Sequence, residues 1–206
     1  MLEIKNIYNK LSSTDVSSLN MSLGDVHAKG LFSLVFHGEK AGRLMRAYVA
    51  NRKVKAFDAQ FHSHTYDLKI TVLKGRVIHH VAKKLDTPMA GALNIPAYKY
   101  RSPLNGGSGE LSYSHEQLIV VEEYIIPPAA TIYLNHDDIH TVSCSKGAIW
   151  VVEELGFQAK EAVTLGSPFY IDDLYRKPEQ FEINHNFQKL RRATQKLIQD
   201  HALCAA

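Results

Sequence analysis

Histidines provide the clearest chemical signal in this sequence. The chain has 11 of them in 206 residues, and His62 and His64 are separated by a single residue in the segment FHSHTYDLKITVL. The residues that follow have a β-strand pattern, and in an extended chain positions i and i+2 project from the same face. Two imidazoles side by side can bind one metal ion at about 2.0–2.1 Å each. A hydrogen-bonded pair on a polar strand face is the alternative interpretation.

A third histidine favours the metal site. His140 follows the polar turn NHDD and opens the β-like segment TVSC, so we expect it at the end of a strand. Two histidines from one strand and one from another can close a metal site inside a barrel. His136 lies four residues earlier and is an alternative ligand to His140, and a turn-capping role is the alternative for His140 itself.

Alternation along the strand sorts the neighbouring residues into two faces. Tyr66 shares the face of the two histidines, so its phenol is a candidate proton donor or substrate anchor, and Tyr133 is a second candidate for that role. Asp67 lies on the opposite face, and it can join the metal coordination only if a β-bulge re-aims it. His79 and His80 are consecutive, so only one of them can approach the interior, where it would orient a ligand.

Short apolar or alternating segments separated by turn residues predict the elements that hold these side chains. They occupy residues 31–36, 43–50, 66–73, 76–82, 118–126, 131–134, 141–144 and 148–155. Many short strands with frequent turns are typical of an all-β sandwich or barrel. No helical pattern alternates with them, which argues against a βαβ architecture. Residues 99–113, which contain RSPLNGGSG, are predicted as a long loop, either a lid or a disordered segment.

The two ends of the chain have a helical pattern, and three parts are expected. Residues 1–29 form an N-terminal segment, residues 30–172 the β-barrel domain and residues 173–206 a C-terminal helical tail. Asn186 is the predicted N-cap of the tail helix. The apolar face of that helix should pack on the barrel or on a partner subunit; it contains Phe187, Leu190, Leu197, Ile198 and His201.

Residues 57–155 resemble the cupin superfamily. The first cupin motif is a Gly, five residues, His-x-His, three or four residues, Glu, six residues and a Gly. His62, His64 and Gly75 match it in order and spacing, whereas position 56 is Ala and position 68 is Leu. Of the second motif only His140 is present. Other residues stand at the positions of its Pro, its second Gly and its Asn, namely Asn135, Asp137 and Cys144.

The resemblance implies a double-stranded β-helix, the jelly roll of RmlC-like cupins, with a metal bound by His62, His64 and His140. A three-histidine site without a carboxylate is similar to that of thiol dioxygenases such as cysteine dioxygenase. It implies a non-haem Fe(II) dioxygenase that acts on a small organic substrate and forms a homodimer. Zinc, nickel, manganese and copper are alternative metals. A counterpart of the thiol dioxygenases' Ser-Pro stretch with its His and Tyr is not found, so a thiol substrate stays open.

Composition limits the classes of partner. Hydrophobic residues make up 45% and charged residues 22%, as in ordinary globular domains. The net charge, 24 − 21 = +3, is too small to indicate nucleic-acid binding, and no apolar run of about 18 residues indicates a membrane span. The start of the chain has no signal-peptide pattern and there are two cysteines, Cys144 and Cys204, which favours the cytoplasm.

Two other functions stay open at this point. The chain could be a cupin that binds a small ligand or a metal without turnover, as a sensor does. It could also be a metal-free cupin of the sugar isomerase or epimerase type, with a histidine as the base.

Overall fold

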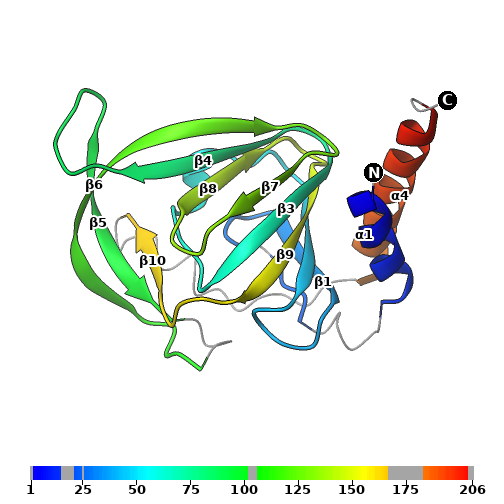
Figure 1. Cartoon of the computed structure of the whole chain (residues 1–206), viewed down its shortest axis with the longest axis horizontal. Coiled ribbons are helices and arrows are strands. Elements are labelled where there is room, and N and C mark those ends of the chain that lie inside the picture. The colour runs from blue at the N-terminus through cyan, green and yellow to red at the C-terminus, as the bar shows by residue number, and fades with distance from the viewer. Residues whose placement is uncertain (1, 15–20, 25, 102–105, 167–182, 204–206) are drawn as a thin grey trace.

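Two five-stranded antiparallel sheets dominate the computed structural model, which describes residues 2–14, 21–24, 26–101, 106–166 and 183–203. One sheet has the strand order β1-β2-β9-β3-β7 and the other has the order β10-β5-β6-β4-β8. The sheets curve around a common interior and form a nearly closed barrel (Figure 1). The strands are β1 (Leu31–His37), β2 (Met45–Ala50), β3 (Tyr66–Lys74), β4 (Val77–Lys84), β5 (Leu93–Tyr100), β6 (Leu111–Ile126), β7 (Thr131–Leu134), β8 (Ile139–Cys144), β9 (Ile149–Phe157) and β10 (Ala162–Leu165).

This architecture confirms the prediction of a mostly β protein with a C-terminal helix. Two helices, α1 (Leu2–Ser12) and α4 (Ile183–Leu203), and a short 3-10 helix, η1 (Ala56–Asp58), accompany the strands in the described residues. Neither α-helix combines the length and the hydrophobicity that crossing a bilayer requires. The predicted boundary between residues 172 and 173 lies outside the described residues.

The first sheet is buried on both faces at β2, its second strand. All six residues of β2 are buried, with Tyr48 and Ala50 in the barrel interior and Met45, Ala47 and Val49 under the helices. The same alternation in β9 sends Trp150 and Val152 inward, because successive side chains of a strand point to opposite faces. A sheet covered on both faces needs nearly continuous apolar strands, which explains the long apolar runs in the sequence.

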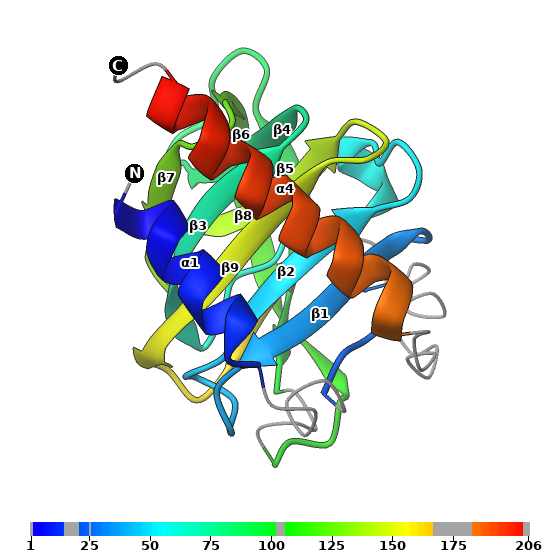
Figure 2. The same cartoon turned by 90° about the vertical axis from the view of Figure 1, so that its right-hand side faces the viewer.

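The two helices lie side by side across the outer face of the first sheet (Figure 2). Ile7 and Leu11 of α1 and Leu190 and Ala193 of α4 are buried in one apolar cluster with β1, β2 and β9. The prediction of Asn186 as the N-cap of α4 is wrong. The helix begins at Ile183, and Asn186 lies inside its first turn, where it is 6% exposed.

The sequence pattern did not predict two of the strands, β5 and β10. β5 contains Pro96, which cannot donate a ladder hydrogen bond and so argues against a strand. Here Pro96 lies just beyond the residues that pair with β10, and its carbonyl accepts a hydrogen bond from Gly166 N at 3.0 Å. β10 has only four residues. The predicted loop 99–113 is shorter, because residues 99–100 belong to β5 and residues 111–113 to β6; residues 102–105 lie outside the description.

Candidate metal centre

Three histidines meet at one end of the barrel. His62 and His64 lie in the segment that leads into β3, and His140 lies in β8. His62 pairs with His140 in an isolated antiparallel bridge, and the His64 backbone N–H donates to the carbonyl of His136 at 2.9 Å. One ring nitrogen from each of the three histidines lies within 4.8 Å of the other two.

The spacing and orientation of the rings suit a shared metal ion. The Nε2 atoms of His64 and His140 are 2.9 Å apart. Two nitrogens that bind one metal at about 2.1 Å and at a right angle are about 3.0 Å apart. His62 Nδ1 donates to the carbonyl of Gln60 at 2.9 Å, which leaves Nε2 of His62 with the free lone pair. Such a hydrogen bond is the usual way in which a metal-binding histidine is oriented.

Burial keeps these rings in the neutral form that binds a metal. It lowers the pKa of His62, and it lowers those of His64 and His140 well below the ordinary value. The positive charge that neighbouring histidines would carry adds to the effect at His64 and His140. Metal binding therefore need not displace protons from these three rings near neutral pH.

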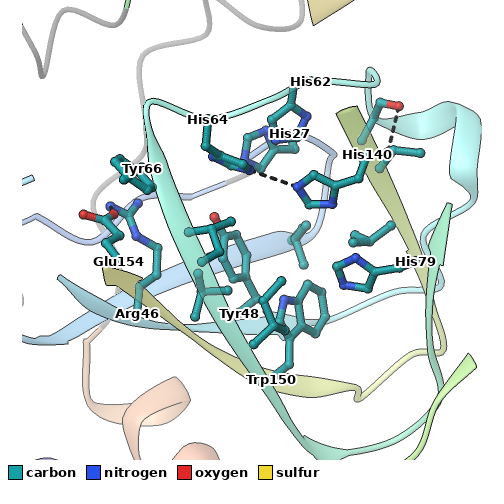
Figure 3. A pocket seen from close by; sticks show the side chains of 17 residues that line it. His27, Arg46, Tyr48, His62, His64, Tyr66, His79, His140, Trp150 and Glu154 are labelled. Carbon is teal, nitrogen blue, oxygen red and sulfur yellow. Dashed lines mark hydrogen bonds and ion pairs between the residues drawn. The ribbon is translucent and has the colours of Figure 1, made fainter. Parts of the chain in front are cut away.

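A cavity of about 50 Å³ adjoins the histidines (Figure 3). That volume corresponds to a few water molecules, at about 10–15 Å³ for each. Its walls are mostly apolar or aromatic, and the aromatic rings of Tyr48 and Trp150 stack at 5.3 Å. The apolar lining is Leu31, Ala59, Leu68, Ile70, Val142, Trp150 and Val152.

Two further histidines line the same cavity. The His79 ring is parallel to that of His140, with centroids 5.2 Å apart, and His79 is 1% exposed. The His27 ring stacks on His62 at 4.5 Å. His80 faces away from the cavity, where its ring nitrogens contact Ser143 Oγ at 2.8 Å and Glu123 at 3.1 Å. The structure thus resolves the open choice between His79 and His80 by placing His79 inside.

A buried ion pair lies at the side of the cavity away from His79 (Figure 3). Arg46 Nη2 donates to Glu154 at 2.5 Å, and Glu154 also accepts the backbone N–H groups of Gly42 at 2.5 Å and Leu44 at 3.3 Å. Burial and the hydrogen bond to Glu154 both raise the pKa of Tyr66. Tyr66 therefore stays protonated, and its ring stacks on His64 at 5.7 Å.

The other candidates lie apart from the three histidines. The prediction that Tyr133 is a proton donor or substrate anchor is wrong. Tyr133 is 68% exposed and pairs with Lys69 on the outer face of the first sheet. Asp67 accepts hydrogen bonds from the backbone N–H of His136 at 2.7 Å and from its ring at 3.2 Å. Asp67 and His136 thus bind each other, and neither belongs to the metal-ligand group found in the described residues.

Sequence reasoning missed His27, Arg46, Tyr48 and Glu154 as cavity residues. Strand alternation held a signal for three of them. Arg46 and Tyr48 share a face in the run 43–50, and Glu154 shares a face with Trp150 in the run 148–155. A charged residue inside an apolar run needs a buried partner, which is the clue that the two runs meet. His27 has no such pattern around it.

Comparisons with known proteins leave the function open. No family model and no curated protein matches this chain. Among solved structures it is similar to a hydroquinone 1,2-dioxygenase, PnpCD, in complex with Cd2+ and 4-hydroxybenzonitrile, with 12% identity and a TM-score of 0.35 over 65% of this chain and 63% of that one. It is also similar to Streptomyces albus HEPD with 2-hydroxyethylphosphonate and Fe(II) bound, with 11% identity and a TM-score of 0.37 over 74% of this chain and 25% of that one.

A third similar structure is described as one protein bound to another. Drosophila melanogaster CENP-C bound to CAL1 matches with 8% identity and a TM-score of 0.35, over 69% of this chain and 80% of the other. Similarity at this level does not distinguish between functions.

Proposed function

We propose that this chain is a metal-dependent cupin, a non-haem Fe(II) dioxygenase that acts on a small organic molecule held in the barrel. His62, His64 and His140 are the metal ligands in this proposal. The observation that carries it is the convergence of their ring nitrogens to within 4.8 Å of one another at the edge of an apolar cavity. Each ring is kept neutral by burial, which is the ligand form that a metal requires.

The ligand set determines the charge of the centre. Three neutral imidazoles leave the charge of a divalent ion uncompensated, unlike the two-histidine, one-carboxylate set of many non-haem iron enzymes. The nearby Arg46 and Glu154 compensate each other and add no net charge. An anionic, chelating substrate would supply the missing charge. Bound Fe(II) would supply the redox chemistry that dioxygen requires, whereas zinc would supply Lewis acidity alone.

The protein side chains then position the substrate and exclude water. Tyr66 presents its ring beside His64, and its protonated phenol donates to Glu154, so Tyr66 acts as a neutral aromatic wall whose oxygen keeps only acceptor lone pairs for a substrate. Tyr133 has no part in this proposal, because it lies on the outer surface. The apolar walls limit the water in the cavity and strengthen each polar interaction inside it.

The proposal includes the fold family and the assembly. Residues 30–172 would form the double-stranded β-helix of a cupin, with residues 1–29 and 173–206 as additions at its two ends. Gly75, which matches the last glycine of the first cupin motif, lies in the turn between β3 and β4. Its φ of 82° is in the left-handed region that favours glycine. We propose a cytoplasmic homodimer, as the family resemblance implies.

Metal analysis and oxygen consumption test this function. The protein is purified without chelators, and its content of iron, zinc, nickel, manganese and copper is measured. About one equivalent of a transition metal is expected, and less than about a tenth of an equivalent after anaerobic Fe(II) reconstitution overturns the proposal. Oxygen uptake is then measured with a panel of thiols, diketones and hydroxy acids. A stoichiometric metal without any turnover on the panel would favour a sensor over a dioxygenase.

One observation favours a second candidate, the metal-free isomerase or epimerase type. The 2.9 Å between Nε2 of His64 and Nε2 of His140 also suits a hydrogen bond between two neutral imidazoles, one of which donates. Such a pair can hold a histidine base in one orientation without a metal. The same metal analysis separates the two candidates, because the metal-free protein would remain free of metal after reconstitution.

A further inference from the structure

A serine, a histidine and a glutamate are in contact on the face of the second sheet that is turned away from the cavity. His80 Nε2 lies 2.8 Å from Ser143 Oγ, and His80 Nδ1 lies 3.1 Å from a carboxylate oxygen of Glu123. A carboxylate can only accept hydrogen bonds, so in the neutral ring Nδ1 carries the proton and Nε2 accepts the Ser143 hydroxyl. A hydroxyl, a base and a third group that orients the base are the signature of an activated nucleophile.

Strand pairing holds these three side chains together. β6, β4 and β8 are neighbours in the second sheet (Figure 1), and Glu123 of β6 pairs directly with His80 of β4. On its other side His80 pairs with Thr141 of β8, so Ser143 is its diagonal neighbour on the same face. Side chains on adjacent strands of one sheet are positioned more precisely than side chains on loops.

A second contact between a serine and a histidine has a different third partner. His115 Nδ1 lies 3.0 Å from Ser114 Oγ, and its Nε2 lies 3.2 Å from the amide oxygen of Gln117. An amide oxygen carries no charge, so it stabilises a protonated histidine less than a carboxylate does. The contacts of His115 therefore provide an internal comparison for those of His80.

The surface beside Ser143 is partly accessible and apolar. Ser143 is only partly buried, and the side chain of Glu123 is 64% exposed. In the next row across the sheet, Ser143 pairs with Ile78 and Ile78 pairs with Ile125, so these three side chains share a face. Ile125 is 61% exposed. An apolar group that covers Ile125 would be buried next to the row that ends at the serine hydroxyl.

A cationic residue lies on the other side of Ser143. Val54 and Cys144 exchange two backbone hydrogen bonds, of 3.0 and 2.9 Å, and both side chains belong to the barrel core. Successive residues of an extended chain face opposite ways, so the next residues, Lys55 and Ser143, lie on the face turned away from the core. Lys55 has extended backbone and is exposed. A positive charge at this position favours the negative oxygen that forms during acyl transfer.

We propose that Ser143 is the nucleophile of an acyl-transfer site for esters of small apolar acids. Ser143 Oγ forms a bond to the acyl carbon, and its proton passes to Nε2 of His80. The bond from the acyl carbon to the ester oxygen breaks, and that oxygen leaves with the proton from His80. Water, deprotonated by His80, then releases the carboxylic acid and restores the serine. Glu123 is a positioning residue that fixes the ring and stabilises its charged form. This chemistry uses no metal and is independent of the function proposed above.

An ester with a coloured leaving group tests the proposal. p-Nitrophenyl butyrate is added to metal-loaded and to chelator-treated protein, because a bound zinc ion can also hydrolyse esters. Release of nitrophenolate is followed by absorbance, and the butyryl group is located by mass spectrometry of peptides. We expect a burst of about one equivalent per chain, with the butyryl group on Ser143 and the same rate in both forms.

Variants assign the reaction to the three side chains. Ser143→Ala should remove the burst. His80→Gln can still form hydrogen bonds but cannot act as the base, so acylation should be about a hundredfold slower. Glu123→Leu changes an exposed side chain and leaves the fold intact, and it should slow acylation about tenfold. Glu123→Gln keeps an acceptor for Nδ1 and should lose less, which a merely structural role of Glu123 does not predict.

Three control variants should keep the full rate. Ser145 is two residues along from Ser143, but its hydroxyl accepts the backbone N–H of Arg76 at 3.1 Å, so Ser145→Ala should have no effect. His115→Gln removes the histidine of the comparison contact. His64→Ala removes a proposed metal ligand and shows whether the reaction depends on the metal site. Circular dichroism checks the fold of each variant.

Four results would overturn the inference: no acylation of Ser143 in the unaltered protein, an unchanged burst in Ser143→Ala, an unchanged rate in His80→Gln, or loss of the reaction on removal of the metal. In the first three cases the contacts of His80 would only satisfy the hydrogen bonds of a buried ring. In the last case ester hydrolysis would belong to the metal site. Failure of the metal site alone leaves the burst unchanged, so the two proposals fail separately.

Discussion

The backbones of His62 and His140 exchange two hydrogen bonds. His62 N donates to His140 O at 2.9 Å, and His140 N donates to His62 O at 3.0 Å. Residues paired in this way in an antiparallel ladder project their side chains from the same face. The pairing thus brings the two rings together, and His64, two residues along, joins them with its Nε2 at 2.9 Å from that of His140. The candidate site therefore forms where the segment before β3 of the first sheet pairs with β8 of the second sheet.

Replacing His64 with Ala should remove the metal without unfolding the barrel. The His64 backbone N–H would still donate to His136, but one of three ligands would be lost. Loss of one of three protein ligands lowers the affinity for the metal steeply, so the metal content should fall from about one equivalent to below about a tenth. Metal content is measured by elemental analysis, and the fold is checked by circular dichroism.

His136→Ala is the matched control for this experiment. Its ring lies near the site but binds Asp67 at 3.2 Å, so the metal content should be unchanged. Full metal content in His64→Ala would refute the ligand assignment. Metal loss in His136→Ala would show that Asp67 and His136 contribute to the site after all.

The metal-free protein should lose stability as the pH falls below about 6.5. Burial lowers the pKa of five histidines in the folded chain, namely His27, His62, His64, His79 and His140. Above pH 6.5 neither state binds these protons. Between pH about 6.5 and the lower folded values, about 4 for His79, only the unfolded chain binds them. Each histidine therefore lowers the free energy of unfolding by up to about 1.4 kcal/mol per pH unit as the pH falls.

Urea unfolding of chelator-treated protein at pH 7.5, 6 and 5 measures this dependence. His79→Leu removes one of the five groups, so the slope of stability against pH should be shallower in that variant. A free energy of unfolding that does not change between pH 7.5 and pH 5 would contradict the prediction.

Glu154→Gln should destabilise the fold strongly. Glu154 is fully buried and pairs with Arg46, whose side chain is 10% exposed, so the substitution leaves a buried guanidinium without its counter-charge. Breaking one side of a buried ion pair costs about 3–5 kcal/mol. The free energy of unfolding is obtained from urea denaturation.

The adjacent Glu153 provides the control for that substitution. It lies on the opposite face of β9, is 24% exposed, and forms ion pairs of 3.6 Å with Lys10 and Lys69. Pairs of this kind contribute less than about 1 kcal/mol. Glu153→Gln should therefore have a small effect, and the double variant Arg46→Met/Glu154→Gln should recover part of the lost stability. If Glu154→Gln and Glu153→Gln lowered the free energy of unfolding equally, the buried Arg46–Glu154 pair would contribute no more to stability than an exposed ion pair.

Local patterns were sufficient to predict the three histidines and the face on which Tyr66, Leu68 and Ile70 lie. The His-x-His spacing and the alternation of a strand operate over a few residues, so they can be read without knowing the fold. The structure places all of these side chains on the lining of one cavity. The mostly β architecture followed from the same short-range alternation.

Features that depend on strand register could not be predicted in this way. Arg46 and Glu154 are 108 positions apart, and only the pairing of β2 with β9 makes them neighbours. Tyr133 was misplaced for the same reason. In the four-residue strand β7, pairing with β3 sets Leu134 opposite Leu68 on the inner face, which sends Tyr133 outward with Lys69. A shift of one residue would have reversed that result.

Alanine substitutions at two glycines with almost the same backbone φ test how tightly the turns of the barrel are packed. Gly75, the glycine that matches the first cupin motif, has a φ of 82°, and Gly147 has a φ of 80°. A Cβ at Gly75 would lie 2.8 Å from Ala148 Cα, whereas a Cβ at Gly147 would meet no atom within 4 Å. Both Ala variants suffer the left-handed backbone cost of about 1–2 kcal/mol. Gly75→Ala adds a clash with backbone, which costs about 1–3 kcal/mol more. Urea unfolding should thus show a clearly larger loss for Gly75→Ala, and equal losses would mean that the β3–β4 turn moves freely away from Ala148.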